Sequence, residues 1–432
     1  MCGIVGYAGK GRAAPVLLEG LKRLEYRGYD SAGIAVLGQK LAVVKRKGRV
    51  EALASEAEKL SGCLGIAHTR WATHGEPSER NAHPHRCGGV AVVHNGIIEN
   101  AALLRAECEA RGEVFSSETD SEVIAHLVAA AYRGDLLRAV QEAVRQLKGS
   151  YSIAVLAEGV RVIVAARRGS PLLVGRGEGS VLASDLPAIA PLANEVYSLK
   201  EGGFALLTED NVRLFDEELR EWKGEPIEFG KVEGDGGKGG YPHYMRKEIA
   251  EDPAAIANSI VDLTADPQFS DISIVLCQTY YIQIVACGTA YHSGVAAKYA
   301  IEALSRVPVE VAIASEYRYR DPIVPKGTLV IAVSQSGETA DTLSAAALAK
   351  ERGAKVLALT NVPYSSLTAL ADLVLLTHAG RETAVAATKS FCAQLASLYS
   401  FAAARAALKG RSAPSLAPFP ALCEDADRKS TR

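Results

Sequence analysis

The sequence has little of what marks several large protein classes: net charge, aromatic side chains and long apolar runs. The formal net charge is −2 and 6% of residues are aromatic, which argues against a nucleic-acid-binding surface. No run reaches the roughly 18 apolar residues of a membrane span, and no basic region precedes the first apolar residues as in a signal peptide. The eight cysteines are scattered, as is typical of free thiols in a reducing compartment. We therefore expect a cytoplasmic protein with neither nucleic acid nor membrane as partner.

The length of the chain and the pattern of its apolar residues predict more than one domain. A chain of 432 residues is long enough for about two to three domains. In residues 2–228, short apolar strands alternate with helical periodicity, which predicts an α+β domain with two sheets covered by helices. Residues 229–245 contain the most glycine-dense run and predict a linker or hinge, although an ordered glycine loop is the alternative.

The pattern of apolar residues changes after the glycine-dense run. In residues 246–410, strand-like segments each precede a loop and usually an alanine-rich helix, which predicts a doubly wound α/β domain with a parallel sheet. The strand-like segments are Ile282–Ala286, Thr328–Val333, Lys355–Leu359 and Leu373–Leu376. Residues 411–432 are proline-rich and polar and predict a fraying tail.

Cys2 is a candidate nucleophile because of its position. Removal of Met1 would leave a thiol and a free α-amine on the same residue. The amine has a reference pKa of about 7.7–8.0, so a useful fraction is neutral at pH 7 and can accept the thiol proton. A lone cysteine is more often a small buried hydrophobe, so the interpretation depends on the rest of the sequence.

Several motifs accompany Cys2 over about 120 residues. They are Cys2 to Tyr7, Leu24 to Ser31, His68 to Gly75, His94 to Asn100 and Thr119 to Glu122. With these motifs the sequence resembles the glutamine amidotransferases that have an amino-terminal cysteine, and closely resembles the glutamine–fructose-6-phosphate aminotransferases. The resemblance runs through nearly the whole chain and implies an αββα glutaminase domain followed by a sugar isomerase (SIS) domain.

The resemblance also implies residue roles. Cys2 would be the nucleophile and, through its amine, the base, while Asn95 and the N–H of Gly96 would form the oxyanion hole. The implied glutamine-binding residues are Arg27, Arg70, Trp71, Thr73, His74, His83 and Asp120. Among them, Arg70 would pair with the substrate carboxylate and Asp120 with its ammonium group.

Each of these residues has a plainer interpretation. Asn95 and Gly96 could form a hairpin turn, Arg70 and Asp120 a weak surface ion pair, and Trp71 a core residue. The motifs taken together favour the glutaminase interpretation. The run from His83 to Cys87 resembles a metal site, but structural zinc prefers a second, distant ligand pair that the sequence does not show, so no metal and no cofactor is predicted.

Three loops follow predicted strands in the second region and could hold a phosphate. They begin at Cys287, Ser334 and Thr383, and each could instead be an ordinary helix cap. The loop from Ser334 to Thr339 resembles the signature of sugar isomerase domains. The resemblance implies that Ser334, Gln335, Ser336 and Thr339 hold the sugar phosphate, with Thr289 and Val385 lining the site.

The resemblance implies the family's partners and its reaction. The partners are L-glutamine and fructose 6-phosphate, the products are glucosamine 6-phosphate and L-glutamate, and the family is homo-oligomeric. Its members have two sugar isomerase subdomains, of which this sequence shows only the first, so we expect glutamine hydrolysis but expect the synthase half-reaction to need a second half. The alternatives are an amidophosphoribosyltransferase, for which no pyrophosphate motif is seen, a sensor of phosphosugars without turnover, and a fragment.

Overall fold

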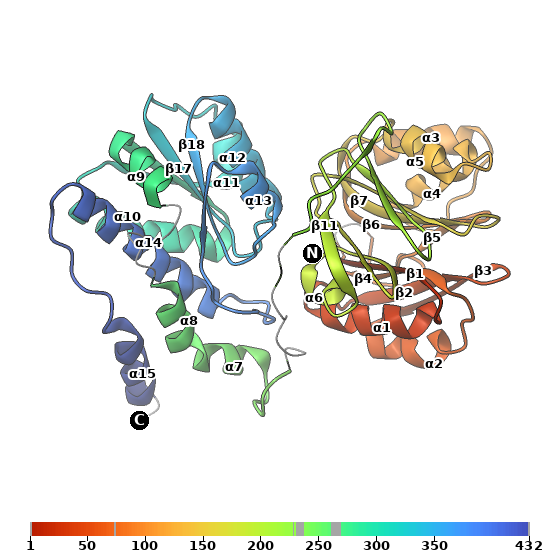
Figure 1. Cartoon of the computed structure of the whole chain (residues 1–432), viewed down its shortest axis with the longest axis horizontal. Helices are drawn as coiled ribbons and strands as arrows, with labels where there is room; N and C mark the ends of the chain where they lie inside the picture. Colours follow the sequence, from red (N-terminus) through yellow and green to blue (C-terminus); the bar gives the residue numbers. More distant parts are fainter. Residues whose placement is uncertain (1, 73–74, 228, 230–236, 261–268, 431–432) are drawn as a thin grey trace. The chain divides into compact units, whose positions relative to one another are not determined.

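The computed structural model describes residues 2–72, 75–227, 229, 237–260 and 269–430. It divides into two compact units, residues 1–235 and 236–432 (Figure 1). Most residues of the predicted linker lie outside the described ranges or in irregular structure. Among the described residues, no helix is both long and apolar enough to cross a membrane.

The first unit contains two seven-stranded antiparallel sheets (Figure 1). One has the strand order β11-β9-β10-β1-β4-β2-β3 and the other β14-β13-β12-β8-β7-β6-β5. The strands of the first sheet are β1 (Gly3–Gly9), β2 (Ser31–Leu37), β3 (Leu41–Lys47), β4 (Leu64–Arg70), β9 (Leu173–Gly177), β10 (Gly179–Ala183) and β11 (Ala193–Ser198). Those of the second are β5 (His85–Cys87), β6 (Val90–Ile98), β7 (Gly149–Ala157), β8 (Ile163–Arg168), β12 (Phe204–Leu207), β13 (Val212–Phe215) and β14 (Glu221–Trp222).

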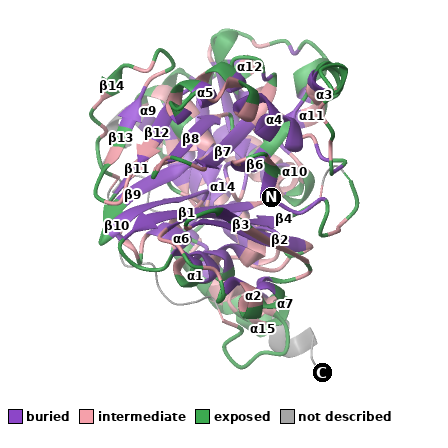
Figure 2. Ribbon diagram, turned by 90° about the vertical axis from the view of Figure 1, so that its right-hand side faces the viewer, coloured by how far each residue is buried: buried purple, intermediate pink, exposed green. Residues whose placement is uncertain are grey.

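Helices cover the outer face of each sheet of the first unit. They are α1 (Ala13–Leu24), α2 (Ala54–Ala57), α3 (Ala101–Ala110), α4 (Glu122–Ala131), α5 (Leu136–Val144) and α6 (Leu186–Ile189), with short 3-10 turns at Glu25–Arg27 and Val50–Leu53. Alternate residues of a strand point to opposite faces, so Ile4 packs between the sheets while Val5 packs with α1. Val93 likewise faces the inner layer, and Val92 packs with α4 and α5. Strands of both sheets, such as β1 and β7, are largely buried (Figure 2). The predicted αββα sandwich is confirmed.

The second unit contains one five-stranded parallel sheet of order β16-β15-β17-β18-β19. Its strands are β15 (Tyr281–Ala286), β16 (Val309–Ile313), β17 (Thr328–Val333), β18 (Lys355–Thr360) and β19 (Leu373–Leu376). Its helices are α7 (Tyr244–Ala250), α8 (Asp252–Ser259), α9 (Phe269–Gln278), α10 (Gly288–Ser305), α11 (Ala314–Tyr319), α12 (Ala340–Glu351), α13 (Ser366–Leu370), α14 (Lys389–Leu408) and α15 (Phe419–Ser430).

Both faces of this sheet are buried under helices. On one face Ile284 and Ile331 pack with α10 and α14, and on the other Val330 packs with α11, α12 and α13. The predicted doubly wound fold is confirmed. In such a sheet the loops after β15 and β17, which are adjacent parallel strands, lie at the same edge.

One prediction for this unit was wrong. The proline-rich tail does not simply fray, because Phe419–Ser430 forms α15, which contacts α8. Pro420 is tolerated because it lies in the first turn of the helix, where the missing N–H has no intrahelical partner.

Candidate active site

Cys2 lies directly before β1, next to the end of β4. The pairing of β1 with β4 places Gly3 opposite Thr69, so Cys2 lies close to Arg70 and Trp71. The backbone N–H of Trp71 donates to Cys2 Sγ at 3.3 Å. Burial raises the pKa of the Cys2 thiol above its usual value, and this effect outweighs the lowering by the Trp71 N–H and the Arg70 charge. The thiol therefore needs a base before it can attack.

Asn95 lies beside Cys2 with its side-chain amide held in one orientation. His68 Nε2 lies 2.9 Å from the carbonyl oxygen of His94 and 3.0 Å from Asn95 Oδ1. Because both of these atoms accept hydrogen bonds, Nε2 must carry the hydrogen. Asn95 Oδ1 therefore faces His68, and Nδ2 faces Cys2, donating to the Cys2 carbonyl oxygen at 3.1 Å. Among the described residues Nδ2 has no second acceptor, so its other hydrogen is available for a substrate oxygen.

Arg27 holds the backbone of Cys2 from another direction. Its Nε donates to the Cys2 carbonyl oxygen at 3.1 Å, and its guanidinium forms an ion pair with Asp185 at 2.7 Å. Arg27 is 7% exposed, so this pair is shielded from solvent. The carbonyl group of the candidate nucleophile thus accepts hydrogen bonds from Arg27 and Asn95, which fixes its position.

Gly96 follows Asn95 in β6 and cannot carry a side chain without strain. Its φ is +128°, and a Cβ would lie 2.1 Å from the carbonyl oxygen of Ser150 in β7. Real Cβ atoms essentially never approach another atom below 3.0 Å. The glycine therefore allows β6 and β7 to pair closely beside the candidate oxyanion hole.

The other predicted glutamine-binding residues lie around the end of β4 and the end of β6. Arg70 is buried and donates to the carbonyl oxygen of Gly75 at 3.1 Å. Asp120 is half-buried, and its Oδ2 accepts the N–H of Ile98 at 2.8 Å. Trp71 is 37% exposed and packs edge-on against Tyr29, as expected of a residue on a pocket rim.

Two predicted residues, Thr73 and His74, lie outside the described residues. His83 is buried, and its Nδ1 accepts the N–H of His94 at 3.2 Å. The structure thus brings Cys2, Arg27 and Asn95 into direct contact.

His83, which was predicted to bind glutamine, lies in a cluster of four buried histidines that the sequence analysis did not predict. We call His68, His83, His85 and His94 the histidine cluster; the ring centroids of His68 and His83 lie 4.1 Å apart. Burial lowers the pKa of all four, to about 3 for His68. They are neutral at pH 7 and can serve as hydrogen-bonding groups without adding positive charge beside Arg70. The sequence signal was weak: only His68, after Ile66 and Ala67, and His94, after Val92 and Val93, follow a pair of apolar residues.

The predicted phosphate loop follows β17 and leads into α12. Ser334 Oγ lies 2.9 Å from Thr339 Oγ1 and accepts the N–H of Gly337 at 3.1 Å. Ser336 Oγ accepts the N–H of Glu338 at 3.1 Å. Gln335 is anchored by its carbonyl oxygen, which accepts the N–H of Asn361 at 3.0 Å. The loop therefore gathers hydroxyl groups before a helix amino terminus, which suits an anion.

The remaining predicted sugar-binding residues flank this loop. Thr289 is exposed at the start of α10, directly after β15, the strand adjacent to β17. Val385 is 71% exposed in the segment before α14. Both are accessible to a ligand.

Glu248, which the sequence analysis missed, holds the segment that carries Val385. Its carboxylate accepts the backbone N–H of Thr383 at 2.5 Å and that of Ala384 at 3.0 Å. Glu248 is 2% exposed and lies on α7, far from these residues in sequence. It therefore positions a loop that the sequence analysis associated with the sugar.

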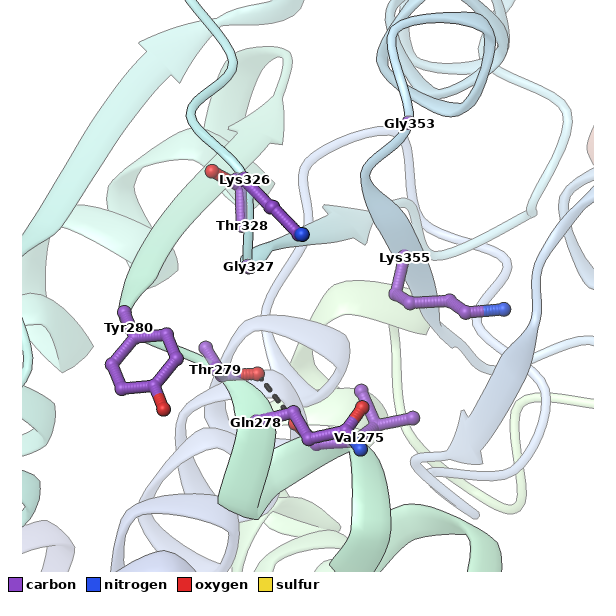
Figure 3. Close-up of a pocket in the computed structure, with 9 residues that line it drawn as sticks. All are labelled: Val275, Gln278, Thr279, Tyr280, Lys326, Gly327, Thr328, Gly353 and Lys355. Atoms are coloured by element: carbon purple, nitrogen blue, oxygen red, sulfur yellow. Dashed lines mark hydrogen bonds between the residues drawn. The ribbon is translucent and has the colours of Figure 1, made fainter.

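A cavity of about 470 Å³ lies at the opposite edge of the parallel sheet (Figure 3). It is lined at the amino ends of β15, β17 and β18 by residues that include Tyr280, Lys326, Thr328 and Lys355. Ligands of open parallel sheets bind at the carboxyl ends of the strands. This cavity is therefore separate from the loop of Ser334.

Comparison with known proteins identifies the family. A glutamine amidotransferase domain model matches residues 68–191 and a SIS domain model matches residues 276–404. The glutamine–fructose-6-phosphate aminotransferase (isomerizing) of Clostridium tetani is 49% identical over 423 residues, which cover 95% of this chain and 70% of that protein. The chain belongs to this family.

Other members of the glutamine–fructose-6-phosphate aminotransferase family align over a similar range. The protein of Symbiobacterium thermophilum is 51% identical over 92% of this chain and 68% of its own length. The solved C-terminal domain of the Francisella tularensis glucosamine-fructose-6-phosphate aminotransferase is 40% identical over 44% of this chain and 55% of that chain, with a TM-score of 0.39. The identities with the Clostridium tetani and Symbiobacterium thermophilum proteins confirm the family predicted from the sequence motifs.

Proposed function

We propose that the chain is a glutamine-dependent aminotransferase that converts L-glutamine and D-fructose 6-phosphate to L-glutamate and D-glucosamine 6-phosphate. Its family membership and its two domain matches support this reaction. The observation that carries the glutaminase half is the Asn95 amide, which His68 orients with its NH₂ group toward Cys2. The reaction needs no metal and no cofactor at this site.

The first half-reaction uses the thiol of Cys2. After Met1 is removed, the α-amine of Cys2 takes the thiol proton, and the thiolate attacks the side-chain amide carbon of glutamine. Asn95 Nδ2 and the Gly96 N–H stabilise the oxyanion of the tetrahedral intermediate. The protonated amine gives its proton to the departing nitrogen, ammonia leaves, and water hydrolyses the thioester to release glutamate.

Charged groups around Cys2 hold the substrate in this scheme. Arg70 binds the α-carboxylate of glutamine, since its planar guanidinium matches a carboxylate, and Asp120 binds the α-ammonium group. Trp71 and His83 lie beside the bound glutamine in this scheme, the family resemblance implies the same role for Thr73 and His74, and Arg27 fixes the backbone of Cys2.

The second unit holds the phosphosugar in this scheme. Ser334, Gln335, Ser336 and Thr339 bind the phosphate and nearby hydroxyl groups, with Thr289 and Val385 lining the site. We assign no residue of this chain to sugar ring opening or to the proton transfer of isomerisation. Glutamine hydrolysis is therefore the half of the reaction that the named residues account for. The expected assembly is a homo-oligomer.

The test compares wild type with Cys2→Ala. Intact mass reports whether Met1 is absent, and assays with both substrates measure glutamate and glucosamine 6-phosphate. The proposal predicts glutamate release by wild type and none by Cys2→Ala. Glutamate without glucosamine 6-phosphate would restrict the activity of this sequence to hydrolysis. Tight fructose 6-phosphate binding by a wild type that releases no glutamate would contradict the proposal and favour a sensor.

A further inference from the structure

Three potential metal ligands converge on the outer side of the second sheet of the first unit. Cys87 ends β5, Glu113 follows α3, and His126 lies in α4. Their Sγ, carboxylate oxygen and imidazole nitrogen atoms all lie within 4.8 Å of one another. None of the three takes part in the proposed glutamine chemistry.

The separations are close to those of a tetrahedral metal site. Zinc binds sulfur at about 2.3 Å and nitrogen at about 2.0–2.1 Å, so tetrahedral angles put these two ligands about 3.5 Å apart. Cys87 Sγ lies 3.5 Å from His126 Nδ1. Glu113 Oε2 lies 2.5 Å from the same nitrogen, which is about 0.8 Å less than a tetrahedral oxygen–nitrogen edge. Glu113 is on an irregular segment after α3, where a shift of this size is feasible.

The surroundings of His126 hold its ring in the orientation that a ligand needs. Glu122 Oε1 lies 3.9 Å from Nε2, on the side of the ring away from Cys87, and Glu122 is itself held by Ser116 and Ser117. Metal-binding histidines usually donate their second N–H to a carboxylate, and a movement of about 1 Å would bring Glu122 within hydrogen-bond distance of Nε2. Phe115 stacks on the imidazole at 4.1 Å.

Negative charge is concentrated around the ring of His126. Two carboxylates, Glu113 and Glu122, approach the buried imidazole, and Arg111 binds only the outer oxygen of Glu113. Either a proton on the imidazole or a bound cation therefore balances the carboxylates.

We propose that Cys87 Sγ, Glu113 Oε2 and His126 Nδ1 bind one divalent metal ion of the zinc class, with water in the fourth position. Binding displaces the thiol proton and the imidazole proton, so two positive charges replace two protons and the net charge of the cluster is unchanged. Cys87 is partly exposed, which gives the ion a path from solvent. The ion would tie β5 to α4, the helix that begins next to Asp120.

The test uses the full chain with Cys2→Ala, so that the nucleophilic thiol cannot bind the probe. After dialysis against a chelator, Zn²⁺ should bind at one per chain and raise the thermal midpoint of the first unit by about 5–10 °C at 100 times its Kd. Co²⁺ should give a thiolate-to-metal charge-transfer band in the near ultraviolet.

Two variants and one control locate the site. Cys87→Ser should abolish the Co²⁺ band and weaken Zn²⁺ binding at least tenfold, and His126→Gln should do the same. Cys63→Ser, a partly buried thiol of the same unit, should leave both unchanged. Cys87→Ser keeps the proposal testable even where His126→Gln fails to fold. No Zn²⁺-induced shift, or a band that persists in Cys87→Ser, would overturn the proposal.

Discussion

The replacement Gly96→Ala tests whether close pairing of β6 and β7 sets the geometry beside Cys2. The new Cβ would lie 2.1 Å from the carbonyl oxygen of Ser150 and 2.7 Å from its carbon. Both are backbone atoms and cannot rotate away as a side chain would. The strands must therefore separate by about 1 Å to restore an ordinary contact.

A second glycine serves as a control that separates the backbone strain caused by Gly96→Ala from its steric clash. Gly134 has a φ of +99°, and a Cβ there would meet nothing within 4 Å, so Gly134→Ala adds strain alone. Such strain costs about 1–3 kcal/mol, or roughly 2–12 °C in the midpoint of a unit of this size. Gly96→Ala adds the clash and should lower the midpoint by at least twice as much as Gly134→Ala.

The same clash should displace the neighbouring Asn95 from Cys2. We expect glutamate release to fall by about 10²–10³-fold in Gly96→Ala, as for the loss of one oxyanion donor, and to stay near wild type in Gly134→Ala. Calorimetry and a glutamate assay on the two variants measure both effects. Equal midpoints and undiminished glutamate release in Gly96→Ala would refute the reasoning.

Three further predictions use other features of the two units. Asn95→Ala should reduce kcat for glutamate release by about 10²–10³-fold with little change in KM, whereas Asn100→Ala should not; equal rates in both would contradict the oxyanion role. Because burial depresses the pKa of the histidine cluster, the unfolded first unit binds protons that the folded unit does not. The stability that the cluster contributes should be full above pH 6.5 and fall below it by up to about 1.4 kcal/mol per pH unit for each histidine. Urea unfolding at pH 6.0, 5.5 and 5.0 measures this loss, because the opposite contribution of His126, whose pKa is raised, changes little in that range; a flat profile would count against the prediction. Glu248→Ala should weaken fructose 6-phosphate binding in calorimetry about tenfold or more, and Glu248→Gln less, because it keeps an acceptor for the Thr383 N–H; unchanged affinity in Glu248→Ala would exclude a positioning role.

Local sequence patterns predicted the helices and strands better than they predicted the long-range contacts. In the second unit, β17 and β19 were predicted to the residue and β15 and β18 to within one residue, because a parallel strand covered on both faces is a continuous apolar run. The edge strand β16 was not predicted. Helical periodicity in the sequence runs from Glu118 to Tyr132, but the helix begins at Glu122, whose carboxylate binds the backbone of Ser116 and Ser117 before the helix starts. Side-chain competition of this kind is not visible in hydrophobic periodicity.

The candidate site was predicted from motifs, and its supporting contacts were not. Cys2, Asn95 and Arg27 lie in three recognisable motifs and make direct contacts in the structure. His68 and Glu248 act on residues that are distant in sequence, and only the pairing of strands and helices brings them there. A single sequence offers no spacing rule for such contacts.

The link from His68 to Asn95 crosses from one sheet of the sandwich to the other. The candidate nucleophile is positioned by β1 of one sheet, and its candidate oxyanion donor by β6 of the other. A shift of one sheet relative to the other by a fraction of an ångström would therefore misalign Cys2 and Asn95 without disrupting any strand. Ile4 and Val93 are buried in the layer between the sheets. Their packing therefore helps to set the alignment of the reacting atoms, as the polar residues do.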